Sequence, residues 1–486
     1  MDQLSDELLL YVFNEVAPPI DTFVPSAQVG LAAVCLVSRQ FYRVANPLLY
    51  QSIILPPESK HHRVTFLLRT LKETPVLKKF VQRIHHKIGC SMPEDGPSQQ
   101  IEHHQNYSQL LTAFLAFQCP SLSHLWIRMP TQYLSLHCAI PLLLKGICRS
   151  ALGSPLGLTH SFANLRTLHV DLQMTKPWPA KYTFPLFLLP TIQELTLTGL
   201  YPDRSHPQSE DTGKLVYGHE WTWPVRSCTI EKLSLLDLVV PSEVVSNMIS
   251  CCKSLQKFNC EAPWSGQYED PGWFNQISEA LLCHADSLED VSLGLSVINR
   301  REHCTWHRFL DLQRLTLVKR LRINYNLATN VTTTFNAGGI LPPNVEFIHF
   351  EIWQTVPEKI GDFLQGLLSA CATKSFLALK KIRLRFRSCD LTSPLPFNYE
   401  ELKALFNNQG ITLDLVLISR FAAYDLYRYD SFQEAEQKVR ELGHVGLKPD
   451  VIQYDEYVLP VLKTFNDVRS EDEKVEEDGL SIWDGP

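Results

Sequence analysis

From about residue 120 onward, apolar residues recur in a short phrase of the form L-x-x-L-x-L. The last two apolar positions of each phrase are two residues apart, which is the period of a β-strand with one buried face. Apolar stretches with helical spacing lie between several phrases, at 244–252, 277–285 and 360–372. The nine phrases have their apolar positions at Leu122/Leu125/Ile127, Leu165/Leu168/Val170, Ile192/Leu195/Leu197, Ile230/Leu233/Leu235, Leu255/Phe258/Cys260, Leu288/Val291/Leu293, Val318/Leu321/Ile323, Val345/Ile348/Phe350 and Leu379/Ile382/Leu384. A strand and a helix repeated in tandem predict an α/β solenoid with a parallel sheet, because each repeat turns the chain in the same sense.

The spacing of the phrases, about 32 residues on average, places them near a known family. They resemble leucine-rich repeats over roughly residues 106–420, with units longer and less regular than the compact classes of about 20–29 residues. The resemblance implies an α/β fold, a leucine-rich-repeat solenoid with its parallel sheet on the concave side and its helices outside. An ordinary α/β domain with leucine-rich strands is the alternative interpretation.

The first fifty residues follow helical rather than strand spacing. Leu4, Leu8 and Val12 form one row at i, i+4 spacing, which predicts an amphipathic helix. Ser5 is a good N-cap for this helix. The paired prolines at 18 and 19 predict its end.

Further helical runs follow along the chain. One covers 29–37, and another begins at Arg39 and is expected to end before Pro47, because the residue before a proline is biased away from the helical conformation. Residues 61–84 have the spacing of one or two more helices. Residues 89–105 are rich in proline, glycine and polar residues, which predicts a surface loop or a boundary.

Three short motifs occur together in the first helical region. They are Leu-Ser-Asp-Glu-Leu-Leu at 4–9, Leu-Val-Ser-Arg-x-Phe at 36–41 and Pro-Leu-Leu-Tyr at 47–50. Followed by irregular leucine-rich repeats, these motifs resemble the F-box, especially its fungal form. The resemblance implies an all-α F-box-like unit that binds the Skp-type adaptor and, through it, the cullin ligase core of an SCF-type ubiquitin ligase.

Carried over residue by residue, the resemblance implies a set of adaptor-binding residues. They are Leu4, Ser5, Leu8, Leu9, Val12, Leu36, Val37 and Phe41. A three-helix unit of about fifty residues cannot bury all of its apolar side chains by itself. Each of these apolar residues therefore faces either the core of the unit or the helices of a partner, and the sequence does not divide them between the two.

The same resemblance implies a non-catalytic subunit that recruits a protein target to the ligase. Two alternatives from other classes stay open: a leucine-rich scaffold whose degenerate F-box no longer recruits the ligase, and a small-ligand-dependent receptor with a pocket in the solenoid. The expected organisation is an F-box-like three-helix unit over 1–55, a helical linker and loop over 56–105, the solenoid over 106–420, a helical C-terminal cap over 421–465 and an acidic, disordered tail over 466–486.

Residues beside the buried leucines of each predicted strand point outward. In the last repeats these outward residues become cationic and include an aromatic side chain. The predicted target-binding residues are Arg320, Arg322, Phe347, His349, Lys381, Arg383 and Arg385. Guanidinium groups pair well with carboxylates and phosphates, so this row favours an acidic or phosphorylated peptide, although Glu346 and Glu351 reduce its positive potential. The alternative is a solvated strand face, with the target bound by loops.

Composition and charge narrow the class of protein. The chain of 486 residues is 45% hydrophobic and carries a net charge of −7, most of it in 467–486, where eight acidic residues accompany Arg469 and Lys474. The nearly neutral remainder argues against a nucleic-acid-binding surface.

No apolar stretch approaches the roughly 18 residues of a membrane-spanning helix, and the N-terminus lacks the basic flank of a secretory signal. The 13 cysteines, without a C-x-x-C pair, favour a reducing compartment, so we expect an intracellular protein of the cytoplasm or nucleus without a membrane partner.

Motifs for catalysis or metal binding are absent from the sequence. There is no phosphate-binding G-x-x-x-x-G-K-[ST], no G-x-S-x-G nucleophile elbow and no H-E-x-x-H zinc motif. His303, Cys304 and His307 have metal-type spacing, but no second ligand pair lies near them to complete a tetrahedral zinc site. We therefore expect no catalytic residues, no metal and no cofactor.

Overall fold

The computed structural model describes residues 4–16, 25–55, 61–86, 112–128, 142–155, 160–172, 178–201, 215–216, 219–263, 273–296, 312–325, 341–353, 360–373, 375–389, 398–419 and 452–453. The chain divides into two compact units, Met1–Leu288 and Glu289–Pro486, here called the N-terminal unit and the C-terminal unit. Both combine helices with parallel strands, so the predicted α/β class is confirmed.

Three helices open the N-terminal unit. They are α1 (Asp6–Val16), α2 (Pro25–Cys35) and α3 (Arg39–Gln51). The Leu8 N–H donates to Ser5 Oγ at 3.4 Å, as expected of an N-cap, and the Phe41 N–H donates to Ser38 Oγ at 3.1 Å at the start of α3. The helices enclose a core of their own, made of Leu9, Phe13, Leu31, Val44 and Ala45. The helical prediction for this region is confirmed.

The predicted end of the third helix is wrong. α3 continues through Pro47 to Gln51. A proline inside a helix removes one backbone hydrogen bond. Beyond it, however, Leu48 and Leu49 pack against the core of the three helices. Continuation of the helix places both leucines on that core, and most helical stability in proteins comes from such packing rather than from local propensity.

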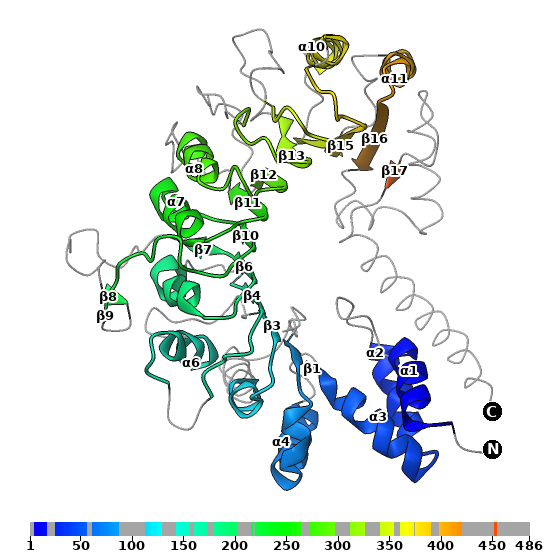
Figure 1. Cartoon of the computed structure of the whole chain (residues 1–486), viewed down its shortest axis with the longest axis vertical. Coiled ribbons are helices and arrows are strands. Elements are labelled where there is room, and N and C mark those ends of the chain that lie inside the picture. The colour runs from blue at the N-terminus through cyan, green and yellow to red at the C-terminus, as the bar shows by residue number, and fades with distance from the viewer. Residues whose placement is uncertain are drawn as a thin grey trace, which may run out of the picture. The chain divides into compact units, whose positions relative to one another are not determined.

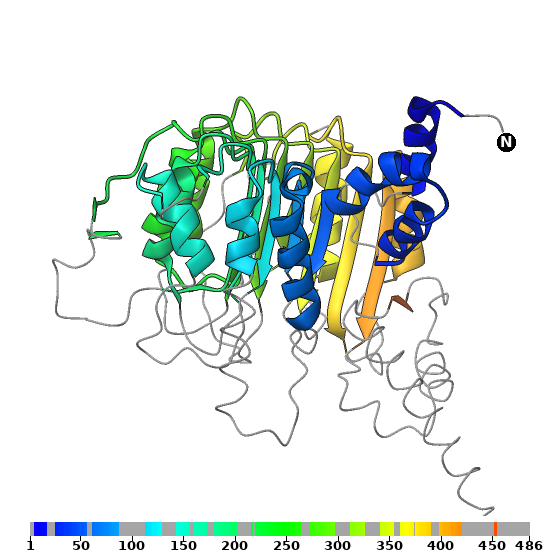
Figure 2. The same cartoon turned by 90° about the horizontal axis from the view of Figure 1, so that it is seen from below.

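A parallel sheet follows the helices directly. Its strands, in their order across the sheet, are β1 (Ser52–Leu55), β2 (Arg83–His86), β3 (His124–Arg128), β4 (Thr167–Asp171), β6 (Glu194–Thr198), β10 (Lys232–Leu236) and β11 (Lys257–Pro263). Every neighbouring pair among these strands is parallel. Figure 2 shows them running side by side in one direction.

Parallel neighbours need crossover connections, which are usually helical. The N-terminal unit contains α4 (His61–Glu73), η2 (Pro75–Lys79), α6 (Leu142–Ala151), η3 (Ala180–Leu188), α7 (Ser242–Cys251) and α8 (Trp273–Leu282). Figure 1 shows α6, α7 and α8 along one side of the row of strands. Two short pairs lie outside this sheet, β5 (Trp178–Pro179) with β7 (Leu200–Tyr201) and β8 (Leu215–Val216) with β9 (His219–Glu220).

The C-terminal unit repeats the arrangement. Its strands are β12 (Asp290–Ser296), β13 (Arg320–Asn324), β14 (Phe347–Trp353), β15 (Lys381–Cys389), β16 (Thr412–Ser419) and β17 (Ile452–Gln453), and each pairs with the next in parallel. Its helices include α10 (Ile360–Ala372) and α11 (Tyr399–Asn408).

The nine phrases lie on strands, and within each unit their middle apolar residues are direct neighbours across the sheet. In the N-terminal unit these neighbours are Leu125, Leu168, Leu195, Leu233 and Phe258. In the C-terminal unit they are Val291, Leu321, Ile348 and Ile382. All of them are buried. The predicted strand periodicity and parallel pairing are therefore confirmed.

Strands β1, β2 and β16 fall outside the nine phrases, and each departs from the pattern at one position. In β1, Tyr50 precedes Ile53 and Leu55, and in β2 a histidine, His86, occupies the last apolar position. In β16, Gly410 occupies the first of the three apolar positions of the phrase. The sheet thus begins before residue 106. Strand β1 lies at the end of the segment expected to be a three-helix unit (1–55), and β2 lies inside the segment expected to be a helical linker (56–105).

Predictions for the end of the chain fall largely outside the described residues. This applies to the acidic tail over 466–486 and to the helical cap over 421–465, except for Ile452–Gln453, which form strand β17 instead of a helix.

Candidate functional site

The helical part of the N-terminal unit presents apolar side chains to solvent. Leu8 on α1 is 54% exposed, and Leu36 and Val37, in the turn between α2 and α3, are 88% and 66% exposed. Leu4 and Val12 are exposed as well. These five residues form what we call the helical apolar surface. Single exposed leucines are common, but a group of them marks a site of interaction.

Polar contacts hold α1 against the start of α3. Gln40 Nε2 donates to the Leu4 carbonyl oxygen at 2.9 Å and to Asp6 Oδ1 at 3.1 Å, and Arg43 forms an ion pair with Asp6 at 2.6 Å. The hydrogen bonds from Arg43 and Gln40 lower the pKa of the Asp6 carboxyl. The exposed turn with Leu36 and Val37 directly precedes α3. Because these contacts hold the start of α3 against the start of α1, the turn lies at the end of the three-helix unit where α1 begins.

The remaining predicted adaptor-binding residues lie elsewhere. Leu9 is only 2% exposed and belongs to the core of the three helices. Phe41 packs edge-on against Phe13, with ring centroids 5.4 Å apart. Ser5 caps α1 with its hydroxyl. The structure therefore divides the helical stripe that the sequence left undivided: Leu9 belongs to the core, and Phe41, partly buried, packs against that core.

All predicted target-binding residues lie together on one face of the C-terminal unit. Neighbouring strands place Arg320, Phe347 and Lys381 in one row across β13, β14 and β15. The next row consists of Arg322, His349 and Arg383, with Arg385 following on β15. The buried residues between them point to the opposite side, as the strand period requires.

Carboxylates compensate most of this positive charge. Glu351, whose side chain is 7% exposed, lies 2.6 Å from Arg322 and 3.3 Å from Arg385. Asp414 on β16 lies 2.6 Å from Lys381 and 3.3 Å from Arg383. Arg320 pairs with Asp290 at 3.3 Å. Sequence reasoning missed Asp414 because β16 lacks the full leucine phrase, and so it overestimated the positive potential of this face.

His349 lies in the middle of the network. Its Nε2 is 3.8 Å from Glu351 Oε1. Burial lowers its pKa to about 4, with Arg322, Arg385 and Arg383 adding to the effect and Glu351 opposing it. His349 is therefore uncharged near pH 7. The Arg383 guanidinium lies over the Phe347 ring, 5.8 Å from its centroid, which is within the range of a cation–π contact.

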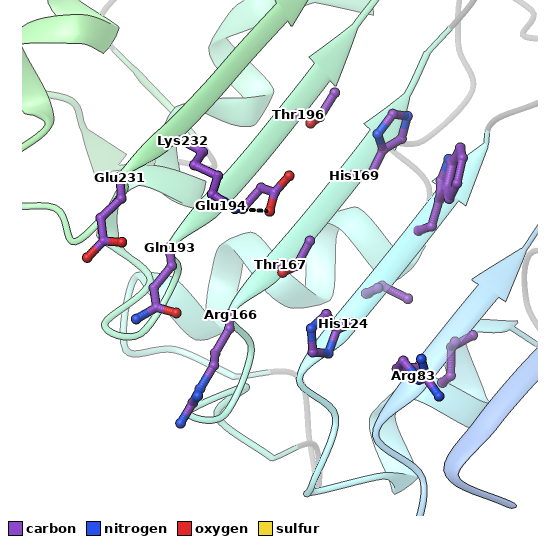
Figure 3. Close-up of a pocket in the computed structure, with 13 residues that line it drawn as sticks. Arg83, His124, Arg166, Thr167, His169, Gln193, Glu194, Thr196, Glu231 and Lys232 are labelled. Carbon is purple, nitrogen blue, oxygen red and sulfur yellow. Dashed lines mark hydrogen bonds and ion pairs between the residues drawn. The ribbon is translucent and has the colours of Figure 1, made fainter. Parts of the chain in front are cut away.

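The N-terminal unit carries an open hollow of about 650 Å³ on its sheet face. Figure 3 shows side chains from β2, β3, β4, β6 and β10 around it, among them Arg83, His124, Thr167, Glu194 and Lys232. Arg166, Gln193 and Glu231 line it from positions just before their strands. Sequence reasoning placed several of these residues on the outward rows but predicted no site there, because a hollow depends on side-chain size across several adjacent strands.

Three rings stand side by side on this face. His85 and Trp126 are nearly parallel, with centroids 4.2 Å apart and an interplanar angle of 9°. His169 lies on the next strand, 4.6 Å from Trp126. The Trp126 indole thus lies between its neighbours on β2 and β4, stacked on His85 and tilted by 49° to the His169 ring.

Comparison with known proteins places the chain in no family. No family model matches it, and no curated protein is significantly similar to it.

The part of the chain that the structure describes offers neither a metal site nor a membrane span. No cluster of three or more histidine, cysteine, aspartate or glutamate side chains there could hold a metal ion. No helix among the described residues is long and apolar enough to cross a membrane. The described surfaces comprise an apolar helical end and two polar sheet faces.

Proposed function

We propose that the protein is a substrate-recognition subunit of an SCF-type ubiquitin ligase. In this proposal α1, α2 and α3 form an F-box that binds the Skp-type adaptor. The parallel strands form a leucine-rich-repeat solenoid whose concave sheet face captures a protein target. The chain itself is non-catalytic and acts by proximity, since holding a target beside a charged ubiquitin-conjugating enzyme raises its effective concentration there.

One observation carries this proposal. The three helices already possess a closed core, yet Leu8, Leu36 and Val37 remain outside it at one end of the unit. Burying one such side chain fully stabilises a complex by about 1.5–3 kcal/mol, so leaving several in water is costly unless a partner covers them. A partner with apolar helices of its own is the chemistry that fits this surface.

Target capture is the second part of the proposal. Among the predicted target-binding cations, Arg320, Lys381 and Arg383 are the more accessible, with side chains 64%, 38% and 38% exposed. An acidic peptide reaching this face would share Lys381 and Arg383 with Asp414. Arg322 is committed to Glu351 and has less to offer such a ligand.

The small-ligand receptor receives less support. The hollow on the N-terminal unit is open and lined largely by charged, imidazole and hydroxyl side chains. A small-molecule site is more commonly an enclosed, apolar cavity that buries most of its ligand.

Adaptor capture by the full chain tests the ligase proposal. The double variant Leu8→Glu, Val37→Glu places charges on the helical apolar surface, and we expect it to lose capture of a purified Skp-type adaptor in a pull-down. Val225→Glu is the matched control, because Val225 is equally accessible but lies outside the three helices. Undiminished capture by the folded double variant would contradict the assignment, and failure of the unaltered chain to capture any adaptor would favour the leucine-rich scaffold.

A further inference from the structure

The hollow on the N-terminal unit arises because short side chains on two strands lie between larger side chains on the strands beside them. Thr167 and Thr196, on β4 and β6, are short. Larger side chains flank them, His124 and Trp126 on one side and Lys232 on the other. The depression is lined mainly by the outward rows, together with the buried residues Ile84 and Leu125.

The dimensions of the hollow indicate what kind of ligand fits. Its lining extends from Arg83 on β2 to Lys232 on β10, across five neighbouring strands. At a strand separation of about 4.8 Å this is a length of roughly 19 Å. An extended peptide advances about 3.3 Å per residue, so roughly six residues would span the hollow. A single small anion would meet only one or two strands.

Charge is distributed unevenly along this length. On the β2–β4 side the polar and aromatic part of the lining is provided by Arg83, His124, Trp126, Arg166, Thr167 and His169, and Ile84 and Leu125 complete it. The carboxylates of the lining lie on the other side, where Glu194 is 3.5 Å from Lys232 Nζ and Glu231 precedes β10. An anionic group is therefore favoured at the β2–β4 side.

The ring row strengthens this preference. His85, Trp126 and His169 lie in one register row on β2, β3 and β4, with His85 stacked on the indole and the His169 ring tilted to it by 49°. The edge of an aromatic ring carries positive electrostatic potential, in contrast to its face. Where the edge of the Trp126 or His169 ring meets a ligand, it therefore favours a carboxylate over a cation.

We propose that this hollow binds an acidic segment of the target protein, in extended conformation across the strands, with its carboxylates over β2–β4. The proposal rests on the proposed function, since it names the part of the target that the sheet face would recognise. The proposed site is distinct from the face formed by β13, β14 and β15, because all of its lining residues belong to the N-terminal unit.

Fluorescence anisotropy with the full chain at low ionic strength tests the site. The probes are a fluorescein-labelled hexapeptide, Glu-Glu-Glu-Gly-Ser-Gly, and its counterpart with glutamine in place of glutamate. We expect the acidic peptide to bind and the amide peptide to bind at least tenfold more weakly. Arg166→Glu, which removes one charge-assisted contact and adds a repulsion, should weaken the acidic peptide about tenfold. Thr167→Glu, which fills the hollow and adds a carboxylate, should do the same.

Lys72→Glu on α4 is the matched control, since it makes the same charge change at an exposed position of the same unit, and it should leave binding unchanged. Absence of binding to the unaltered chain, or equal affinity for both peptides, would overturn the proposal. Two further results would also overturn it. Inorganic phosphate that displaces the labelled peptide as effectively as unlabelled peptide does at the same concentration would indicate a small-anion site. Labelled hexathymidylate that binds more tightly than the acidic peptide would indicate a nucleic-acid site.

The outcome is independent of the adaptor experiment. A chain that binds the acidic peptide but captures no adaptor retains this site and loses the ligase function. A chain that captures the adaptor but not the peptide loses only this site.

Discussion

At the scale of single residues, Glu351 has the largest expected effect on stability. Its buried carboxylate compensates Arg322 and Arg385 together. Glu351→Gln removes that charge while keeping the shape, and removing one partner of a buried ion pair costs about 3 kcal/mol. Urea unfolding should show this loss. Glu346→Gln is the control, because Glu346 pairs with Lys380, whose side chain is 73% exposed, and an exposed pair contributes less than about 1 kcal/mol.

The same network makes a test of target binding by Arg322→Glu difficult to interpret. That substitution would place a second carboxylate beside Glu351 and destabilise the fold before it changed recognition. Arg320→Glu is the better variant, since the Arg320 side chain is largely exposed. If this face binds an acidic peptide, Arg320→Glu should weaken target capture several-fold with little change in unfolding. Unchanged capture would argue against the C-terminal face.

His349 should give the protein a specific pH dependence. Its folded pKa of about 4 lies below the ordinary value of 6.5, so below pH 6.5 the unfolded chain takes up a proton that the folded chain refuses until near pH 4. The contribution of His349 to the free energy of unfolding is therefore fully present above pH 6.5. It decreases as the pH is lowered, by about 3 kcal/mol at pH 4. Unfolding free energies measured from pH 7 to 4 should decrease less steeply for His349→Gln. Parallel pH profiles for the two proteins would contradict the assignment.

At the scale of elements, α3 contains a test of how packing overrides local signals. Pro47 interrupts the hydrogen bonding of a helix that tertiary contacts maintain. Pro47→Ala restores the missing bond, and we expect amides of Arg39–Gln51 to exchange about tenfold more slowly by mass spectrometry. Pro75→Ala is the control, because a proline in the first turn of η2 removes no internal bond. Faster exchange in the Pro47 variant would mean that the proline itself stabilises the helix.

Elements were predictable from the sequence where one period ran without interruption. The nine phrases repeat a buried apolar position in every strand, so the period alone was enough to place Leu168 and its neighbours in the core. β2 and β16 each lack one apolar position of the phrase, and no local signal replaces it. The division of the first helices into core and surface was equally out of reach, because Leu8 and Leu9 differ only in the direction in which the folded helix turns them.

At the scale of the whole molecule, the cysteines report on the integrity of the core. Cys283 is exposed, whereas Cys119, Cys251 and Cys371 are buried, and burial raises the pKa of the first two of these to about 12 and of Cys371 to about 11. Since the thiolate is the reactive form, N-ethylmaleimide should modify Cys283 in the native protein and reach the buried three only on unfolding. Peptide mass spectrometry distinguishes the sites, with Cys283→Ser as the control. Native modification of Cys251 at the rate of Cys283 would contradict the packing of α7.

The separation of inward and outward residues along each strand has an evolutionary consequence. On β4, Leu168 and Val170 are in the core while Thr167 and His169 are outside it, and the neighbouring strands repeat this alternation in register. Natural selection can therefore exchange the outer residues one strand at a time while the hydrophobic layer beneath stays constant. A duplicated copy of such a gene could acquire a new binding specificity through a few substitutions at positions such as Thr167 and Thr196, without passing through an unfolded intermediate. The same freedom makes these positions the natural ones to randomise in a library that seeks new ligands for this scaffold.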